Sequence, residues 1–320
     1  MRIVFCGTPS FAVPTLKHLL AQSDFEIVGV ITQPDRPRGR GQEVSFSAVK
    51  EAALAANLAV HQPEKIRAAE TEALLQKLAP DCVVIIAYGQ IIPAKLLPIP
   101  KLSWINLHAS LLPKYRGAAP INWAIVNGET RTGVTTMRID AGMDTGDMLL
   151  QREIEIGAEE TAPELAARMS EFGAPLMVET LRGLAAGTIA PKAQNHTEAS
   201  YAPMLKKEDG RIDWQRPAIE IYNRMRGFAP WPGAYATFRG QSCHVRGEPV
   251  SKERTAGLTS GTGGATPGTL VVEKNELFVW CGDATVLCVR TVQLEGRKPV
   301  KASDFANGAR LKSGERFGDS

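Results

Sequence analysis

Apolar runs alternate with helix-like stretches through the first half of the chain. Short runs such as Arg2–Cys6 (RIVFC) and Asp81–Ala87 (DCVVIIA) are apolar and bounded by turn residues, which is typical of buried strands. Between the runs, apolar residues recur three or four positions apart, which predicts helices. Further strands are expected at Ile27–Thr32, Trp104–His108, Val134–Ile139 and Met148–Ile156, and helices from about Phe11 and at Phe46–Asn57, Thr71–Leu78, Pro120–Val126 and Ala162–Ala186.

Alternating strands and helices build a parallel sheet that is covered on both faces. The first half of the chain is therefore predicted to be an α/β fold with an open, doubly wound, mostly parallel sheet. Ligands of such sheets bind beyond the carboxyl ends of the strands, near the point where the strand order reverses. Candidate chemistry is therefore expected in the loops that follow the strands.

The pattern changes after residue 188. Residues 189–208 are polar and are interpreted as a linker between a first domain, residues 1–188, and a second domain, residues 209–320. In the second domain a helix is followed by short, turn-separated strands, which are typical of a small antiparallel barrel. The helix is expected at Ala218–Gly227, and the strands at Ala234–Phe238, His244–Arg246, Thr269–Val272, Leu277–Trp280 and Val286–Val292.

Two features of the second domain have more than one interpretation. Ser251–Gly268 has almost no large apolar residue, so we expect a flexible surface insertion and not a folding unit. Trp214 and Trp231 flank basic residues, which can suit stacking on nucleic acid. We expect both to belong to the core of the small domain.

Composition limits the class of protein. The five cysteines form no Cys-x-x-Cys pair and the histidines have no ligand-like spacing, so we expect reduced thiols in the cytoplasm and no metal. No apolar run approaches the roughly 20 residues that span a membrane. The N-terminal MRIVFCGTPSF is interpreted as a core strand and not as a signal peptide. No long apolar stripe is left over, so we expect a monomer.

The charge is distributed unevenly along the chain. Residues 1–200 carry 19 basic and 21 acidic side chains, whereas residues 201–320 carry 18 and 13. A neutral first part and a basic second part suggest a catalytic domain joined to one that meets a polyanion. A surface excess without any partner is the alternative.

The first turn argues against one common function of such folds. Gly7-Thr8-Pro9 takes the place of a dinucleotide fingerprint, but the sequence Gly-x-Gly-x-x-Gly is missing. A dehydrogenase is therefore disfavoured, although the turn can still present backbone amides to a substrate.

Asn106 and His108 lie two positions apart at the end of a predicted strand, so their side chains project to the same face. A neutral imidazole can accept a proton, and a carboxamide can stabilise a developing oxyanion. A histidine that merely ends a strand is the alternative.

The segment Asp140–Asp147 (DAGMDTGD) carries three acids just after a strand. A carboxylate beside His108 would fix the tautomer of the ring and raise its pKa. A solvated acidic turn is the alternative, and the pattern does not choose between Asp140, Asp144 and Asp147.

The loop Gln33–Gly41 carries Arg36, Arg38 and Arg40 and leaves the same edge of the sheet. Arginine suits bidentate contacts with phosphate. An exposed loop without a ligand is the alternative.

Taken together, several stretches resemble the 10-formyltetrahydrofolate-dependent formyltransferases, and the resemblance runs over nearly the whole chain. The combination of NxH, SLLPxYRG and DxGxDTG is highly specific for that superfamily. The arginine loop and the basic second domain point to the member that acts on tRNA. The stretches are FCGTPSFAVPTL, QPDRPRGRG, VVIIAYGQIIP, NLHASLLPKYRGAAPINWAI, DAGMDTGDML and GRIDWQRP with RGFAPWPGAY.

The resemblance implies a Rossmann-like formyltransferase domain followed by an OB-like β-barrel that binds tRNA. It implies transfer of the formyl group of 10-formyltetrahydrofolate to the α-amine of methionyl-initiator tRNA, for translation initiation and without a metal. It places the catalytic residues at Asn106, His108 and Asp144. The implied folate contacts are Ser110, Leu111, Leu112 and Pro113 with the loop Tyr88, Gly89, Gln90 and Ile91, and the implied tRNA contacts are Arg36, Arg38 and Arg40.

Other functions remain possible at this point. Relatives that formylate a nucleotide-linked amino sugar or a purine precursor share the Asn-His-Asp set, although the basic second domain disfavours the purine enzyme. A formyltetrahydrofolate hydrolase would pass the formyl group to water. A tRNA-binding chaperone with a vestigial catalytic fold is disfavoured because all three catalytic positions are filled.

Overall fold

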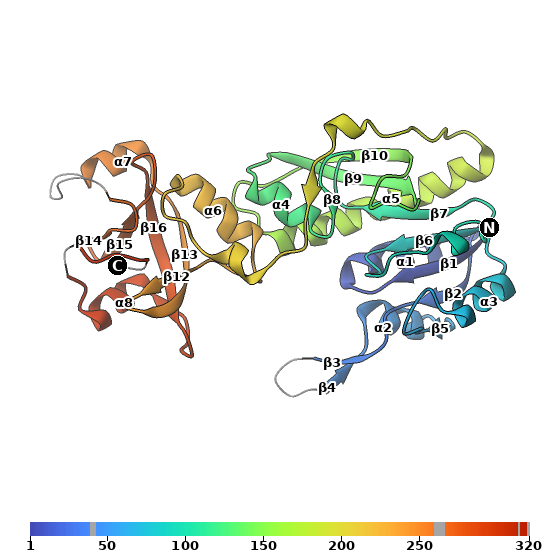
Figure 1. Cartoon of the computed structure of the whole chain (residues 1–320), viewed down its shortest axis with the longest axis horizontal. Coiled ribbons are helices and arrows are strands. Elements are labelled where there is room, and N and C mark those ends of the chain that lie inside the picture. Colours follow the sequence, from blue (N-terminus) through green and yellow to red (C-terminus); the bar gives the residue numbers. More distant parts are fainter. Residues whose placement is uncertain (39–42, 259–265, 313, 319–320) are drawn as a thin grey trace. The chain divides into compact units, whose positions relative to one another are not determined.

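The computed structural model of the chain describes residues 1–38, 43–258, 266–312 and 314–318. It divides into two compact units (Figure 1). Unit 1 consists of Met1–Ile121, Arg131–Ile156 and Glu164–Pro203, and unit 2 of Asn122–Thr130, Gly157–Pro163 and Met204–Ser320. The domain boundaries 1–188, 189–208 and 209–320 stay a prediction.

Unit 1 contains a seven-stranded sheet with the strand order β10-β9-β7-β6-β1-β2-β5. The five strands from β7 to β5 run parallel, and β9 and β10 are antiparallel to their neighbours. This confirms the predicted doubly wound, mostly parallel sheet. The strands are β1 (Arg2–Gly7), β2 (Glu26–Ile31), β5 (Val60–His61), β6 (Cys82–Ile86), β7 (Trp104–His108), β9 (Arg131–Arg138) and β10 (Met148–Glu155).

The central strands account for the continuous apolar runs in the sequence. All of β6 and five of the six residues of β1 are buried. A parallel strand that is covered on both faces has a continuous apolar run and not an alternating one. The chain leaves β1 toward β2 and β5 and then continues on the other side of β1 with β6 and β7. The strand order therefore reverses between β1 and β6.

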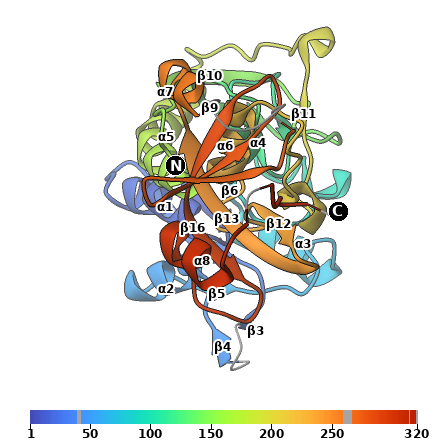
Figure 2. The same cartoon turned by 90° about the vertical axis from the view of Figure 1, so that its left-hand side faces the viewer.

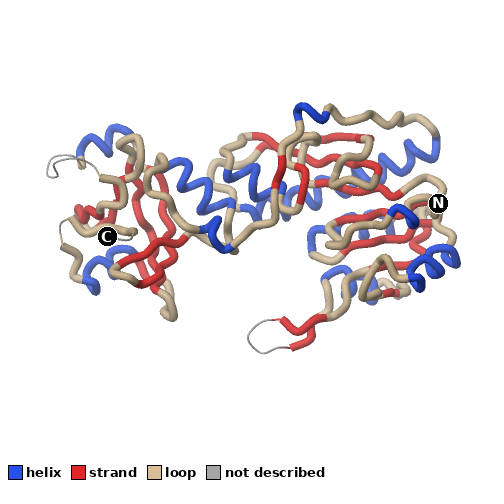
Figure 3. The backbone as a smooth tube through the Cα atoms, viewed as in Figure 1, coloured by secondary structure: helices blue, strands red, loops and turns tan. Residues whose placement is uncertain are grey.

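Helices connect the strands of unit 1 (Figure 3). The first helix begins at Val13 and not near Phe11, because Ser10–Ala12 form a 3-10 turn. Ser47 caps the next helix by accepting a hydrogen bond of 3.1 Å from the Lys50 amide. The helices are α1 (Val13–Leu20), α2 (Ala48–Ala55), α3 (Ala69–Leu78), α4 (Pro120–Val126), whose residues from Asn122 belong to unit 2, and α5 (Ala162–Ala186).

Two small ribbons in unit 1 were not predicted. The hairpin of β3 (Arg36–Arg38) and β4 (Glu43–Ser45) carries the arginine loop. The parallel pair of β8 (Arg116–Gly117) and β11 (Tyr201–Ala202) joins segments that are far apart in the sequence. Runs of two or three residues are too short to produce a periodic signal.

Unit 2 is built on an antiparallel sheet with the order β12-β13-β16-β15-β14, and β17 pairs with β16. Figure 2 labels β12, β13 and β16 of this sheet. The final described segment bonds to both edge strands, β12 and β14. The Leu270 amide of β14 donates to the Glu315 carbonyl, and the Gly318 amide donates to the Thr237 carbonyl of β12, both at 2.8 Å. The elements are α6 (Ala218–Gly227), β12 (Tyr235–Phe238), β13 (Gln241–Pro249), α7 (Lys252–Gly257), β14 (Leu270–Glu273), β15 (Glu276–Trp280), β16 (Val286–Leu294), β17 (Val300–Lys301) and α8 (Ala302–Ala309).

The expectation that Ser251–Gly268 is not a folding unit was wrong in part. Within Ser251–Gly268 the residues Lys252–Gly257 form α7, and Leu258 packs in a buried cluster with Phe278 and Trp280. A serine that caps a short helix can order a segment with little apolar content. Residues 259–265 lie outside the described part of the chain.

Trp214 and Trp231 differ in burial. Trp214 is buried in the core of unit 2, as predicted, and stacks on Phe317. Trp231 is 54% exposed, so its assignment to the core was wrong. Pro230 and Pro232 flank it and keep it outside the regular strands and helices, so no strand or helix pattern determined which way its ring faces.

Candidate active site

Asn106 and His108 lie in the last three residues of β7, at its carboxyl end. Neighbouring strands on both sides fix the backbone here: Asn106 pairs with Ile85 of β6 and Met137 of β9. The His108 side chain is buried, at 6% exposure, whereas Asn106 is half-buried. The predicted strand end is confirmed, and the pairing of His108 with Thr135 of β9 helps to hold the histidine in place.

Both nitrogens of the His108 ring face oxygen atoms. Nε2 lies 2.9 Å from the Tyr115 carbonyl oxygen. Because a carbonyl only accepts, Nε2 donates in this bond. Nδ1 lies 3.6 Å from Asp144 Oδ2, which is within ion-pair distance when the ring is protonated. The ring is therefore held on one side by the backbone and on the other by a carboxylate.

Asp144 lies in the loop that joins β9 and β10. Its φ of 53° is in the left-handed region, which an aspartate tolerates better than most residues. Its Oδ2 accepts a hydrogen bond of 2.9 Å from the Gly117 amide. Only glycine fits there, because Gly117 has a φ of 121° and a Cβ would lie 2.6 Å from the Ala202 carbonyl oxygen. The carboxylate that faces His108 is thus fixed by a backbone amide.

The other acids of the loop are arranged differently. Both Asp140 carboxylate oxygens accept from the Thr145 hydroxyl, at 2.8 and 2.9 Å, and one also accepts from the Gly142 amide at 3.0 Å. Asp140 therefore shapes its own turn. Among the described residues, Asp144 is the acid that the structure records in ion-pair contact with His108, and not Asp140 or Asp147. The geometry thus separates three acids that the sequence pattern left equivalent.

A buried polar group joins this loop to β8. Gln194 donates from Nε2 to the carbonyl oxygens of Asp144 and Gly146, both at 2.8 Å. Its Oε1 accepts from Arg116 Nη2 at 2.7 Å and from Arg116 Nε at 3.0 Å. Sequence reasoning missed both residues. Gln194 falls in the predicted linker, and a single glutamine carries no periodic or motif signal.

Ser110–Pro113 follow β7 and are held by side chains from the neighbouring strands. The Thr135 hydroxyl donates to the Ser110 carbonyl at 2.6 Å and accepts from the Leu112 amide at 3.2 Å. Gln151 of β10 donates to the Leu112 carbonyl at 2.8 Å. The Ser110 side chain is fully buried and donates to the Lys114 carbonyl. The segment is a rigid turn whose polar groups are mostly used internally.

The loop Tyr88–Ile91 follows β6, at the point where the strand order reverses. The Thr8 hydroxyl after β1 donates to the Tyr88 carbonyl at 3.2 Å and ties the two loops together. The Tyr88 ring is buried, and burial raises the pKa of its hydroxyl well above the ordinary range. Gln90 accepts from the Ile66 amide and donates to the Glu64 carbonyl, whereas Ile91 is 84% exposed. The accessible part of this loop is therefore the Ile91 side chain and nearby backbone.

The arginine loop is anchored at its base. Lys50 of α2 donates to Asp35, and Gln62 donates to the other oxygen of the same carboxylate at 2.9 Å. These two bonds hold the pKa of Asp35 below its ordinary value, and the bond from Lys50 has the larger effect. Arg36 is exposed, and the backbone of Arg38 lies in β3. Arg40 lies outside the described residues.

Comparison with known sequences identifies the family. The sequence profile of the formyl transferase family matches residues 1–181, and that of the formyl transferase C-terminal domain matches residues 204–310. A methionyl-tRNA formyltransferase of Solibacter usitatus is 54% identical over 100% of this chain and 99% of its own length. One of Koribacter versatilis is 52% identical over 99% of both chains. The chain belongs to the methionyl-tRNA formyltransferase family. It is therefore a formyl-transferring enzyme, and the resemblance is confirmed.

Solved structures agree on the fold of this family member. The sugar 3N-formyl transferase WlaRD, solved in the presence of dTDP and 5-N-formyl-THF, matches with a TM-score of 0.63 at 20% identity over 93% of this chain and 99% of its own. HypX from Aquifex aeolicus in complex with tetrahydrofolic acid matches with a TM-score of 0.59 at 16% identity, over 100% of this chain and 51% of its own. The formyltransferase fold is confirmed.

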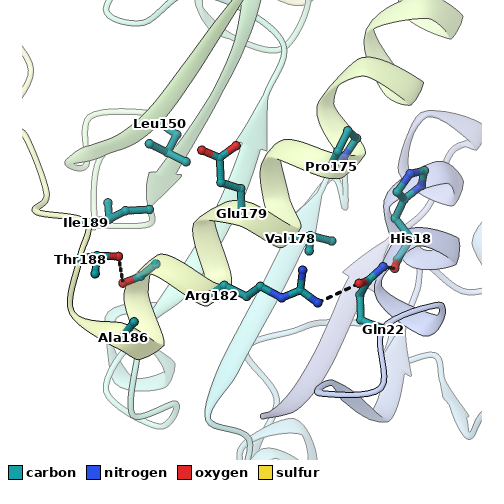
Figure 4. A pocket seen from close by; sticks show the side chains of 11 residues that line it. His18, Gln22, Leu150, Pro175, Val178, Glu179, Arg182, Ala186, Thr188 and Ile189 are labelled. Atoms are coloured by element: carbon teal, nitrogen blue, oxygen red, sulfur yellow. Dashed lines mark hydrogen bonds between the residues drawn. The ribbon is translucent and has the colours of Figure 1, made fainter.

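A cavity of about 650 Å³ lies elsewhere on unit 1, between α5, α1 and the segment after α5 (Figure 4). Val178, Pro175 and Ile189 form part of its apolar lining. Its charged groups are paired: Arg182 donates to Asp24 and Gln22, and Glu179 accepts from Arg152. None of the residues predicted for catalysis lines this cavity.

No group of three or more His, Cys, Asp or Glu side chains in the described part of the chain could hold a metal ion. None of the helices described has the length and apolar content needed to cross a membrane. All five cysteines are buried and free.

Proposed function

We propose that the site at the carboxyl end of β7 transfers the formyl group of 10-formyltetrahydrofolate to the free α-amine of methionyl-initiator tRNA. The product is N-formylmethionyl-tRNA for translation initiation. The observation that supports this most is the contact of His108 with Asp144, in a chain about half identical to methionyl-tRNA formyltransferases over its full length.

The proposed chemistry needs a stabilised oxyanion and one net proton transfer. The amine attacks the formyl carbon, and the new C–N bond produces a tetrahedral oxyanion. Asn106 and protonated His108 stabilise this oxyanion by hydrogen bonding. The bond from the formyl carbon to N10 then breaks, and the proton lost by the amine replaces the formyl group on N10. His108, with a bound water, carries this proton.

Asp144 is proposed to hold and charge the imidazole. Its carboxylate accepts from the Gly117 amide and faces the ring at the same time, so it keeps one orientation as the charge on His108 changes. For His108 to exchange a proton with a substrate, a ring nitrogen has to leave either the Tyr115 carbonyl or Asp144.

The turn Ser110, Leu111, Leu112 and Pro113 is proposed to support the folate, with Tyr88, Gly89, Gln90 and Ile91 as the wall of the pterin pocket. The residues of these two segments are suited to form the wall of a binding pocket. Leu111 and Pro113 are half-buried and Ile91 is exposed, so they can offer apolar surface to a flat ring. The formyl group is already activated on the cofactor, so no metal is invoked.

Arg36, Arg38 and Arg40 are proposed to contact phosphates of the tRNA acceptor end. The excess of basic residues after residue 200 supports a second tRNA contact in the proposed domain 209–320. We further propose that the protein acts in the cytoplasm, where initiator tRNA is used, and that it is a monomer.

The direct test is incubation of the purified chain with methionyl-initiator tRNA and 10-formyltetrahydrofolate labelled in the formyl group. Label is expected in the aminoacyl-tRNA, on the methionine amine. Release of the label as formate with tRNA present or absent would instead establish a hydrolase. Retention of all label on the folate would overturn the proposal.

A further inference from the structure

Gln194 is a buried carboxamide whose hydrogen-bonding groups are all used. Its side chain is 6% exposed. Both N–H groups donate to carbonyl oxygens of the Asp144 loop, and its oxygen accepts twice from Arg116. A carboxamide has two N–H donors and one oxygen with two lone pairs, so this side chain is fully satisfied. Few other side chains of this length could make the same four bonds.

These bonds join the two segments that place the Asp144 carboxylate. One segment is the loop itself, where Asp144 has a left-handed backbone that persists only if its surroundings hold it. The other is β8, where Gly117 follows Arg116 and donates its amide to Asp144 Oδ2. Gln194 bonds to both at once, through the Asp144 carbonyl and through the Arg116 side chain. Its loss would free the carboxylate to move away from His108.

Gln194 also has a purely structural role, which is to accept hydrogen bonds from the buried guanidinium of Arg116. The guanidinium is buried, at 2% exposure, and its further partner is His196 Nδ1 at 3.2 Å. Within the described part of the chain, the structure records no carboxylate in ion-pair contact with Arg116. Gln194 therefore does two separable things: its oxygen satisfies Arg116, and its nitrogen holds the Asp144 loop.

We propose that Gln194 is a positioning residue for formyl transfer, acting on His108 through the placement of Asp144. This inference rests on the proposed function of the His108–Asp144 pair. It assigns the kinetic effect of Gln194 to its two N–H bonds with the loop. The bonds to Arg116 serve the stability of the fold.

Gln194→Glu separates these two contributions. The carboxylate keeps acceptors for Arg116, but it has no N–H to donate to the Asp144 and Gly146 carbonyls. Gln194→Met, which is similar in length, loses both kinds of bond. Asn195→Ala is the matched control, because within the described residues the recorded bonds of the exposed Asn195 side chain are to its own turn, to Thr197 and Glu198.

We expect Gln194→Glu to fold with a smaller loss of thermal midpoint than Gln194→Met, because its ion pair with Arg116 offsets part of the two lost loop bonds, and to lower kcat about 10- to 100-fold, as a displaced catalytic group does. KM for both substrates should stay within about twofold, since binding surfaces are unchanged. Gln194→Met should lower both kcat and the thermal midpoint, whereas Asn195→Ala removes the cap of a short surface turn and should leave kcat unchanged. Wild-type kcat in Gln194→Glu would overturn the inference.

Two further measurements distinguish positioning from general damage. In an Asp144→Asn background, Gln194→Glu should cause no additional loss, because the residue it positions is already disabled; a full additional loss would contradict positioning. Hydrogen exchange of the Gly117 amide should accelerate in Gln194→Glu and not in Asn195→Ala. If the wild type makes no formylmethionyl-tRNA, the proposed function fails, and unchanged Gly117 exchange alone would then refute the placement of Asp144 by Gln194.

Discussion

The Gly117 amide donates a 2.9 Å hydrogen bond to Asp144 Oδ2, the same oxygen that lies 3.6 Å from His108 Nδ1. A backbone amide cannot rotate away as a side chain can, so it fixes the carboxylate relative to the ring. Gly117 is itself fixed by β8, which pairs with β11. The site is therefore built from a strand end, a loop and a short ribbon that are separated widely in the sequence.

Asp144→Asn should remove most formyl transfer. The asparagine can still accept from Gly117, but it carries no charge opposite His108. We expect kcat to fall about 10²- to 10⁴-fold, the usual contribution of acid–base catalysis, and His108→Ala to fall similarly. Rates of label transfer to methionyl-tRNA measure this, with thermal unfolding as the control for folding. Near wild-type turnover in either folded variant would refute the assignment.

The sequence was sufficient to predict the main elements of the fold. Buried parallel strands such as β6 produce continuous apolar runs, and α5 and α6 carry a clear helical period, so these were predicted closely. The edge hairpin β3–β4 and the terminal helix α8 were not predicted. The strands of the hairpin have three residues each, which is too few for a periodic signal, and α8 lies where no helix was expected.

The site was predictable only in part. Asn106 and His108 could be placed at a strand end from their spacing, and the family motif selected Asp144. Neither kind of reasoning found Gln194, which lies 50 residues after Asp144 in a polar stretch. A residue that acts by bonding to carbonyl oxygens far away in the sequence produces no signal in hydrophobic periodicity or in motif spacing.

Neutralising Arg36, Arg38 and Arg40 together, each to Gln, should weaken tRNA use and reduce its salt dependence. Each lost phosphate contact lowers the slope of log(kcat/KM) against log[salt] by about 0.7 to 0.9. KM for the folate should not change. Arg131→Gln is the control, because this exposed arginine of β9 is paired with Glu153. An unchanged salt slope in the triple variant would exclude the loop as a phosphate contact.

Asp35→Asn should destabilise the protein in a pH-dependent way. Its bonds from Lys50 and Gln62 hold the pKa of Asp35 below the ordinary value of 3.8. A lowered pKa means that the stabilisation is fully present above 3.8 and is lost as the pH falls through the folded-state pKa. Urea unfolding of wild type and variant should differ at neutral pH and converge in acid. A difference that stays constant down to acidic pH would contradict this ion pair.

Phe317→Ala tests whether the final segment completes the core of unit 2. The ring is 1% exposed, stacks on Trp214 at 5.6 Å and meets Phe238 edge-on at 5.9 Å. Removing a buried phenylalanine costs about 3–5 kcal/mol, through lost burial and the cavity left behind. The matched control is Ile219→Ala, since Ile219 is 54% exposed on α6 and should change stability by less than about 0.5 kcal/mol.

Urea titrations followed by tryptophan fluorescence compare the two variants. Four of the five tryptophans lie in unit 2, and Trp214 contacts the deleted ring, so the signal reports mainly on this unit. A small effect of Phe317→Ala, equal to that of Ile219→Ala, would mean that the segment joining β12 and β14 is dispensable for the core. A large effect means that the edges of this sheet depend on the end of the chain. Truncations before Phe317 would then expose both edge strands.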